Sequence, residues 1–267
     1  MKFAFSTLGC PDWTLEQVAT AARDYGYEGV ELRLVDGNLI TSETVRTNRD
    51  RLERLFDAAI LPIVGFGSSA RFSMTDETER RQNVEAATRI IDVASELGVP
   101  LVRVFGGKRP DGVDEATGID NVVKGLNELA TAAERAGVTV ALETHDDFSS
   151  AVLVSSVMER VPSRAVGVIW DTHHPHRVGE SSEQIWKAIG ERLVHVHVKD
   201  ARRNGGGWDL VLLGEGEVPV DEVVNLLRRE GYPGFISVEW EKKWHPEIPT
   251  PEVALPQHLD KLRSYLT

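Results

Sequence analysis

The sequence of 267 residues predicts an α/β fold, a single (β/α)8 barrel that spans residues 1–267. Three observations indicate this fold. Eight short apolar runs alternate with longer amphipathic segments, no polar linker or low-complexity tract interrupts them, and the length matches the roughly 250 residues of such a barrel. The alternative fold is a doubly wound open sheet, but no G-x-G-x-x-G or P-loop motif follows any of the runs.

The eight apolar runs are the expected strands. Most of them contain β-branched residues, which is typical of strands buried on both faces of a parallel sheet. The expected strands are Phe3–Ser6, Gly29–Leu32, Pro62–Phe66, Leu101–Phe105, Thr139–Glu143, Gly167–Trp170, Val194–Val198 and Phe235–Glu239. Several segments that follow them are long, and in a barrel such segments lie together on the catalytic face. These segments are residues 67–75, 106–115, 171–180 and 200–219.

The amphipathic segments between the runs are expected to be helices, for example residues 14–25 and 76–97. Thr14 is followed by Gln17 three residues later, which predicts a capping box at the start of the first of these helices. Glycine takes the left-handed conformation without a steric penalty, so a glycine shortly before a strand indicates the end of a helix. The glycines in such positions are Gly26, Gly98, Gly137 and Gly231.

Ligand-type residues stand at or just past the end of four of the expected strands. They are Glu143, Asp171, His197 and Glu239. Carboxylate oxygens and imidazole bind hard divalent ions, and strand ends are rigid places from which distant segments converge on one ion. Strand side chains alternate between faces, so His195, His197 and Lys199 share the face toward the barrel axis, where unpaired polar groups are costly. This pattern favours a metal site.

The same residues also have purely structural interpretations. Glu143 and Glu239 would then form salt bridges at the strand ends, and Asp171 would cap the following turn by accepting backbone N–H bonds. His195 is expected to be a buried, hydrogen-bonded histidine below the site. Two further histidines are expected in the loop after Asp171: His173 and His176.

Composition and charge exclude several classes of partner. The formal net charge is −12, and Lys and Arg form no cluster beyond short pairs, so a nucleic acid would be repelled. No apolar run approaches the roughly 18 residues of a membrane span. Cys10 is the only cysteine, which favours a reducing, cytoplasmic location. The sequence is compatible with a homo-oligomer. Residues 245–256 are expected to form a docking or lid segment, and Trp244 is a candidate subunit contact.

Short motifs follow one another in order along nearly the whole chain. They are Gly29-Val30-Glu31-Leu32-Arg33, Leu142-Glu143-Thr144-His145, Trp170-Asp171-Thr172-His173-His174, His195-Val196-His197-Val198-Lys199-Asp200, Leu213-Gly214-Glu215-Gly216 and Gly231-Tyr232-Pro233-Gly234. In order and spacing they resemble the xylose-isomerase-like TIM barrel superfamily, which includes sugar and sugar-phosphate isomerases, epimerases, inosose dehydratase-like enzymes and endonuclease IV. The resemblance implies that the four strand-end residues hold one divalent metal ion. It also implies that His174 and Arg203 contact substrate oxygens.

A site of this kind implies proton abstraction next to a carbonyl group. Mn²⁺ or Mg²⁺ is the expected ion, with Co²⁺ or Zn²⁺ as substitutes, and it would act as a Lewis acid that stabilises an enediolate. Glu143 and Glu239 are the expected proton carriers. Arg203 and Lys199 are expected to help hold an anionic intermediate. The expected substrate is a small polyhydroxylated carbonyl compound, which is a sugar, a sugar phosphate or a keto-polyol.

The reaction stays open between isomerase, epimerase and dehydratase, a lyase. The ketose 3-epimerase branch of the family carries a substrate-binding glutamate six residues after the first metal glutamate, where this chain has Ser149. His145, two residues after Glu143, is the candidate substrate contact instead, so the epimerase interpretation is weakened. Two alternatives lie outside this chemistry. They are a non-catalytic sugar-binding barrel and an endonuclease IV-like DNA-repair enzyme, which would need histidines that the early strands lack.

Overall fold

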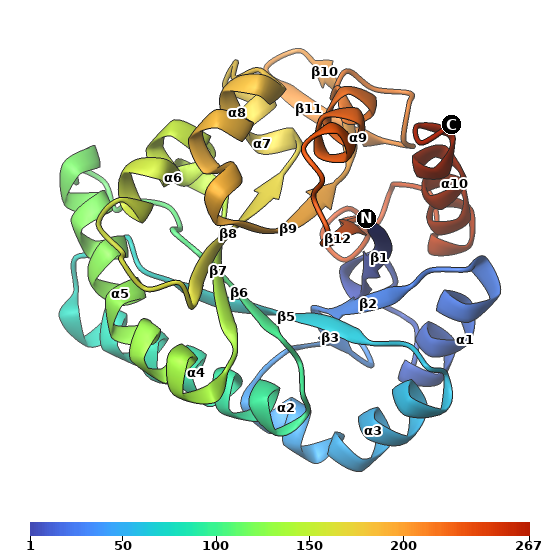
Figure 1. Cartoon of the computed structure of the whole chain (residues 1–267), viewed down its shortest axis with the longest axis horizontal. Helices are drawn as coiled ribbons and strands as arrows, with labels where there is room; N and C mark the ends of the chain where they lie inside the picture. Colours follow the sequence, from blue (N-terminus) through green and yellow to red (C-terminus); the bar gives the residue numbers. More distant parts are fainter.

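Eight parallel strands close into a barrel with the helices outside it in the computed structural model of the chain, which describes residues 1–267 (Figure 1). The strands are β1 (Lys2–Ser6), β2 (Gly29–Leu32), β5 (Ile63–Arg71), β6 (Leu101–Phe105), β7 (Thr139–Glu143), β8 (Val166–Asp171), β9 (Leu193–Val198) and β12 (Phe235–Val238). Their order around the barrel is β1-β12-β9-β8-β7-β6-β5-β2. The predicted fold class is confirmed, because the sheet is closed rather than open.

Closure of the barrel depends on β1, which pairs with the last strand and with the second. Phe3 pairs with Ile236 of β12, and Phe5 pairs with Val30 of β2. The bounds agree with the predicted strands to within one residue, except that β5 continues to Arg71. All eight carboxyl ends therefore meet at one mouth of the barrel, as the sequence predicts.

Ten helices cover the outside of the barrel (Figure 1). They are α1 (Leu15–Tyr25), α2 (Ser42–Thr47), α3 (Arg49–Ala58), α4 (Glu77–Glu96), α5 (Glu115–Ala136), α6 (Ala151–Met158), α7 (His173–Arg177), α8 (Ser182–Ile189), α9 (Val220–Arg229) and α10 (Pro251–Ser264). The capping box of Thr14 and Gln17 is present at the start of α1. The four glycines expected at helix ends all have positive φ, from 66° at Gly98 to 86° at Gly26. The capping box and the glycines therefore sufficed to predict where these helices begin or end.

Two small hairpins interrupt the loops at the barrel mouth. One joins β3 (Leu34–Val35) to β4 (Asn38–Leu39), and the other joins β10 (Asp200–Asn204) to β11 (Gly207–Val211). Neither hairpin was predicted, and residues 200–219 were expected only as a long segment after a strand. The side chain of Asp200 fixes the base of the second hairpin by accepting hydrogen bonds from four backbone N–H groups. The donors are Ala201, Gly214, Gly216 and Val218.

The barrel axis is apolar near the starts of the strands and polar near their ends. Leu101, Ala141 and Ile169 pack together inside the barrel. Two residues further along each of these strands, on the same face, lie the charged residues Arg103, Glu143 and Asp171. The axis therefore provides a rigid apolar floor beneath the mouth.

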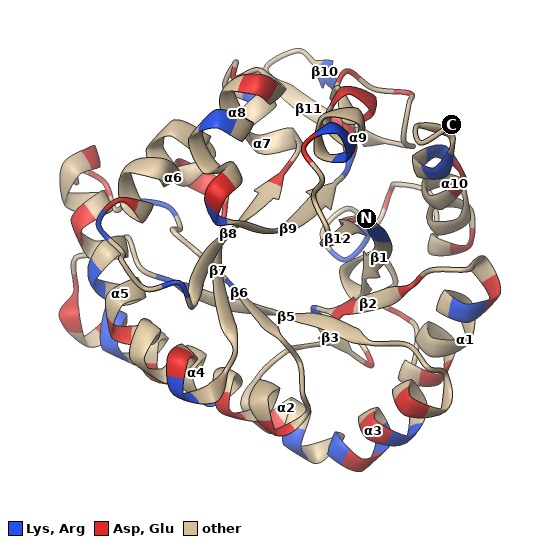
Figure 2. Ribbon diagram, in the orientation of Figure 1, with Lys and Arg blue, Asp and Glu red and all other residues tan.

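The outer helices carry charges of both signs. Acidic and basic residues are interspersed along outer helices such as α3 and α4 (Figure 2). No helix combines the length and apolar character needed to cross a bilayer.

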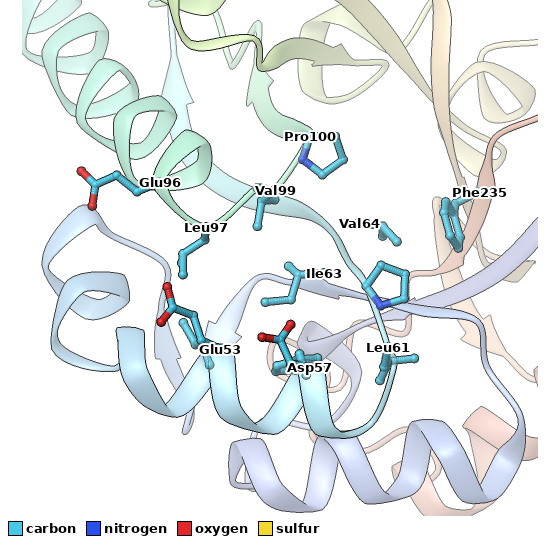
Figure 3. A pocket seen from close by; sticks show the side chains of 14 residues that line it. Glu53, Asp57, Leu61, Ile63, Val64, Glu96, Leu97, Val99, Pro100 and Phe235 are labelled. Carbon is cyan, nitrogen blue, oxygen red and sulfur yellow. The ribbon is translucent and has the colours of Figure 1, made fainter.

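A cavity of about 510 Å³ lies at the opposite end of the barrel from the mouth. Its apolar wall comes from α3, the end of α4, the first residues of β5 and Phe235, and Glu53, Asp57 and Glu96 also line it (Figure 3). Because it lies at the starts of the strands, it is separate from the ligand-type residues at their ends.

Candidate metal centre

The four strand-end residues converge at the mouth of the barrel. Glu143 ends β7, Asp171 ends β8, His197 lies in β9, and Glu239 follows β12. One ligand atom from each lies within 4.8 Å of the ligand atoms of the other three. All four side chains are buried, with at most 4% of the residue exposed. The structure thus brings together residues that are up to 96 positions apart (143 to 239) in the sequence.

Carboxylates on both sides of the ring fix the orientation of His197. Its Nε2 lies 2.7 Å from Oε2 of Glu31, and its Nδ1 lies 2.9 Å from Oε1 of Glu143 and 3.5 Å from Oε1 of Glu239. Burial opposes protonation of the ring, but the charges of Glu31, Glu239 and Glu143 outweigh it and raise the pKa of His197 well above its usual range. A carboxylate behind the ring is the usual support for a metal-ligating histidine.

Arg103, in the middle of β6, anchors Glu143. Its Nη1 donates to Oε2 of Glu143 at 2.6 Å, and both side chains are almost fully buried. Burial alone would raise the pKa of the Glu143 carboxyl, but the Arg103 guanidinium and His197 hold it well below its usual range. Glu143 is therefore held as a carboxylate in a fixed orientation. The salt bridge expected under the structural interpretation of Glu143 is therefore present, but it involves only Oε2.

Asp171 divides its two oxygens between the backbone and the site. Oδ1 accepts hydrogen bonds from the backbone N–H groups of His173 at 2.8 Å and His174 at 3.3 Å, so the residue does cap the following turn. Oδ2 lies 2.9 Å from Nζ of Lys199 and accepts no hydrogen bond from another group. The cap orients the carboxylate, because rotation of the side chain would break both backbone bonds.

Lys199 lies fully buried among carboxylates. Its Nζ is 2.9 Å from Asp171 and 2.7 Å from Oε2 of Glu239, and it also contacts Glu241. Burial opposes its charge, but Asp171, Glu239 and Glu241 outweigh this effect and raise the pKa of Lys199 well above its usual range. The ammonium group therefore neutralises two of the candidate ligands, rather than standing free to meet a substrate.

Histidines form the wall of the mouth above the four candidate ligands. The ring centroids of His145 and His174 are 4.3 Å apart, and both ring nitrogens of His174 lack a partner although the residue is 6% exposed. Burial, followed by the charge of Lys199, lowers the pKa of His174 well below its usual range, so the ring is neutral. The expectation for His173 and His176 is wrong, because both lie in helix α7 and His173 is buried. Asp171 nucleates that helix through its cap.

Arg203 lies on the outer hairpin rather than among the buried residues. It is exposed, and its guanidinium lies 5.0 Å from the centroid of the Trp208 ring. Trp208 in turn lies 5.2 Å from the ring of His173. Arg203 is thereby placed at the rim of the mouth, through a cation–π contact with Trp208 rather than through a contact with the four candidate ligands.

The buried charges at the mouth fit a divalent cation. Five carboxylates surround the site, but only three cations do, so two negative charges are in excess when the histidines are neutral, as they must be to bind a metal. The carboxylates are Glu31, Glu143, Asp171, Glu239 and Glu241, and the cations are Arg33, Arg103 and Lys199. Three carboxylates and one imidazole are donors suited to Mn²⁺, Mg²⁺ or Zn²⁺. The residues present therefore fit such an ion.

Three charged residues of the mouth were not predicted as site residues: Glu31, Arg33 and Arg103. A signal for them exists, because Glu31 and Arg33 alternate in a strand motif and Arg103 is a charge in the middle of the apolar run Leu101–Phe105. The rule that a polar residue facing the axis needs a partner applies to these strands as well.

Comparison with known proteins adds two kinds of similarity. The sequence pattern of the xylose isomerase-like TIM barrel family matches residues 19–265. The chain is 25% identical to an uncharacterized protein of Methanocaldococcus jannaschii over 90% of this chain and 83% of that protein. It is 22% identical to the fructoselysine 3-epimerase of Shigella flexneri over 100% of this chain and 98% of that protein. It is 24% identical to the inosose isomerase of Halalkalibacterium halodurans over 80% of this chain and 78% of that protein.

Solved structures share the whole fold. The IolI protein, solved with a bound zinc atom, superimposes with a TM-score of 0.83 at 19% identity, covering 100% of this chain and 98% of that one. The D-psicose 3-epimerase of Clostridium cellulolyticum, solved with D-tagatose, gives a TM-score of 0.78 at 19% identity, covering 100% and 99%. At these identities the likeness shows a common architecture.

Proposed function

The chain belongs to the xylose isomerase-like TIM barrel family, and from this premise we propose that it is a divalent-metal-dependent enzyme that moves a proton next to the carbonyl group of a small polyhydroxylated compound. The reaction is an isomerisation, an epimerisation or a dehydration. The observation that carries the proposal is the convergence of Glu143, Asp171, His197 and Glu239 at the barrel mouth.

These four residues would hold the ion. When bound, the ion would act as a Lewis acid on adjacent carbonyl and hydroxyl oxygens, acidifying the intervening C–H bond and stabilising the enediolate. Glu31 and Arg103 position two of the ligands, since the first fixes the ring of His197 and the second fixes the carboxylate of Glu143.

Glu143 and Glu239 are the proton carriers in this proposal. They come from β7 and from the residue after β12, and both approach the same ring nitrogen of His197, at 2.9 and 3.5 Å. Carboxylates from different strands can reach a small substrate from different sides, so one removes the proton and the other returns it. Return to the neighbouring carbon gives an isomer, and return to the opposite face gives an epimer.

Histidines of the wall would bind the hydroxyl groups of the substrate. His174 offers two ring nitrogens that have no partner in the protein, and the ring of His145 packs edge-on against it. Ser149, at the position of the epimerase glutamate, donates its hydroxyl to the carbonyl oxygen of Asp146 and is buried, so it cannot replace that glutamate. Loss of a β-hydroxyl, which is the dehydratase outcome, therefore stays within the proposal.

The names of the relatives support this class of chemistry. Fructoselysine 3-epimerase, inosose isomerase and D-psicose 3-epimerase are all enzymes of polyhydroxylated carbonyl compounds by name, and the IolI structure holds zinc. We extend the substrate class and the need for a metal, but not a specific substrate, to this chain. Arg203 remains a candidate substrate contact at the rim of the mouth. Lys199 acts instead as a cation that balances the negative charge of Asp171 and Glu239.

Two other functions are less consistent with the site. A DNA-repair endonuclease of this fold would need further histidines at the early strand ends, where this chain has Gly67 and Gly106. A non-catalytic sugar-binding barrel would not need two carboxylates held at one ring nitrogen of His197. It predicts ligand binding without turnover, which the following experiment measures.

Exchange of a substrate proton with solvent tests the proposal before the product is known. We would incubate the protein with Mn²⁺ and a panel of keto-sugars and keto-inositols in D₂O, and follow deuterium entry beside the carbonyl by NMR. We expect exchange with at least one compound, loss with EDTA, recovery with Mn²⁺, and loss in Glu143→Gln. The surface variant Glu53→Gln should match the wild type. Deuterium exchange that continues unchanged in EDTA, or binding of a compound without any exchange, would contradict the proposal.

A further inference from the structure

One buried cation at the barrel mouth has no acidic partner. Arg33 directly follows β2 and is only 7% exposed. Its Nη1 donates to the carbonyl oxygen of Gly67 at 2.9 Å, and it forms no ion pair, whereas Arg103 and Lys199 both contact carboxylates. Burial of an unpaired guanidinium is costly. A buried arginine without an acid in the protein therefore indicates a place for an anion from outside.

Arg33 and Arg103 meet above Gly67 in β5. A Cβ atom on Gly67 would lie 3.0 Å from Cδ of Arg33 and 3.0 Å from Nη2 of Arg103. Glycine at this position leaves the space that the two side chains occupy. Since Arg103 contacts Glu143 at 2.6 Å, Arg33 lies one side chain away from a proposed metal ligand. An anion on Arg33 would therefore lie within the reach of a small molecule at the metal centre.

The guanidinium of Arg33 keeps one edge free. Nη1 is bound to Gly67, but Nε and Nη2 have no hydrogen-bond partner in the protein. These two N–H groups are parallel and match the two oxygens of a carboxylate. With a divalent ion bound, the charges at the mouth sum to zero, so the single negative charge of a carboxylate is less costly to add than the two charges of a phosphate dianion.

We propose that the substrate is a polyhydroxylated carbonyl compound that carries a carboxylate, and that Arg33 binds this carboxylate beside the metal centre. The inference rests on the proposed function, because that function supplies the second attachment point of the same molecule. Arg33 thereby selects a sugar acid or keto acid against the neutral sugar. Arg103 contributes indirectly, since its ion pair with Glu143 offsets the negative charge of that carboxylate.

Matched pairs of ligands isolate the contribution of the carboxylate. We would measure binding to the Mn²⁺-loaded protein by calorimetry for hydroxypyruvate against dihydroxyacetone and for D-gluconate against D-glucitol. D-glucitol 6-phosphate serves as a phosphate probe. In the wild type we expect the acid of at least one pair to bind about tenfold or more tightly than its neutral partner, as a charge-assisted bidentate pair predicts.

Variants of Arg33 identify the group responsible. Arg33→Gln should abolish the preference for the acid, Arg33→Lys should keep part of it, and the exposed-site control Arg160→Gln should keep all of it. A wild type without the preference would overturn the inference. So would a preference that persists in Arg33→Gln, because the ion would then bind the acid, and so would a preference for the phosphate over both acids.

The proposed function is read out separately on the same samples. If deuterium exchange is observed but the acids bind no more tightly than their neutral partners, only the role of Arg33 is overturned. Absence of Mn²⁺ binding or of exchange overturns the proposed function itself. If Arg33→Gln does not fold, the wild-type comparison and Arg33→Lys still decide the inference.

Discussion

Glu31 and His197 are joined by a hydrogen bond of 2.7 Å between Oε2 and the Nε2–H group, on the side of the ring opposite the candidate ligands. The two residues are 166 positions apart in the sequence. Because the carboxylate accepts only, it keeps a proton on Nε2, so Nδ1 is the nitrogen that would give up its proton to bind an ion. Nδ1 faces Glu143 and Glu239, so the barrel holds the ring ready to bind an ion there.

Removal of this support should weaken metal binding. In Glu31→Ala the ring of His197 loses its acceptor, and we expect the affinity for Mn²⁺ to fall by about 10- to 100-fold, the usual effect of losing such a partner. Calorimetric titration measures the change. Glu53→Ala, a surface glutamate, is the control. Equal affinities in Glu31→Ala and the wild type would show that Glu31 does not position His197.

Replacement of Lys199 should separate the metal-free protein from the metal-bound one. Lys199→Met leaves Asp171 and Glu239 without their buried cation, and breaking a buried pair costs about 3–5 kcal/mol. We therefore expect a marked fall in the melting temperature in EDTA and a larger rise on adding Mn²⁺ than in the wild type. Thermal unfolding with and without the ion measures both. A variant as stable as the wild type in EDTA would be inconsistent with this charge balance.

Asp200 should be essential for the hairpin that carries Arg203 and Trp208. In Asp200→Asn an amide N–H₂ group would face backbone donors, so we expect a loss of about 2–3 kcal/mol in the free energy of unfolding. Urea unfolding checks this value. Asp209→Asn, on the exposed strand of the same hairpin, should change stability by less than about 0.5 kcal/mol. A similar loss in both variants would argue against a specific role for the Asp200 carboxylate.

His258 in α10 should make stability depend on pH. Burial lowers the pKa of His258 to about 4, and its Nδ1–H donates to the carbonyl oxygen of Ala254. The unfolded chain takes up this proton near pH 6.5 but the folded chain does so only near pH 4, so stability falls as the pH is lowered through this window, by about 3 kcal/mol in total.

The contribution of His258 is isolated by comparing variants. His258→Gln should show a smaller loss of unfolding free energy between pH 6.5 and pH 4, measured by urea titrations in EDTA. The control His245→Gln, at a half-exposed position outside α10, should behave as the wild type. If all three proteins lost the same free energy across this range, the assignment to His258 would be refuted.

Local signals were enough for the strands and for the four strand-end residues. Alternation in β9 placed His195 and His197 on the axis, where His195 is indeed buried and bonded to Ser237 at 2.8 Å. The fold follows from the repeated strand and helix pattern, because closure needs only that the last strand return beside the first. Glycine at helix ends marked the boundaries for a steric reason that needs no tertiary information.

Contacts between distant strands could not be read from local patterns. The pairing of Arg103 with Glu143, and of Lys199 with Asp171, depends on which axis-facing residues share a level in the barrel, which the register sets. The hairpin of β10 and β11 was missed because its strands are short and most of their residues are exposed or half-buried. The helical positions of His173 and His176 depend on the cap of Asp171.

The number of ions that each chain binds tests the central claim most directly. We would titrate Mn²⁺ into the EDTA-treated, dialysed protein by calorimetry, with Asp171→Asn as the ligand variant and Asp209→Asn as the surface control. We predict one Mn²⁺ per chain in the wild type and in the control, and much weaker binding in Asp171→Asn. No binding in the wild type, or unchanged binding in Asp171→Asn, would contradict the assignment of the four strand-end residues as a metal centre.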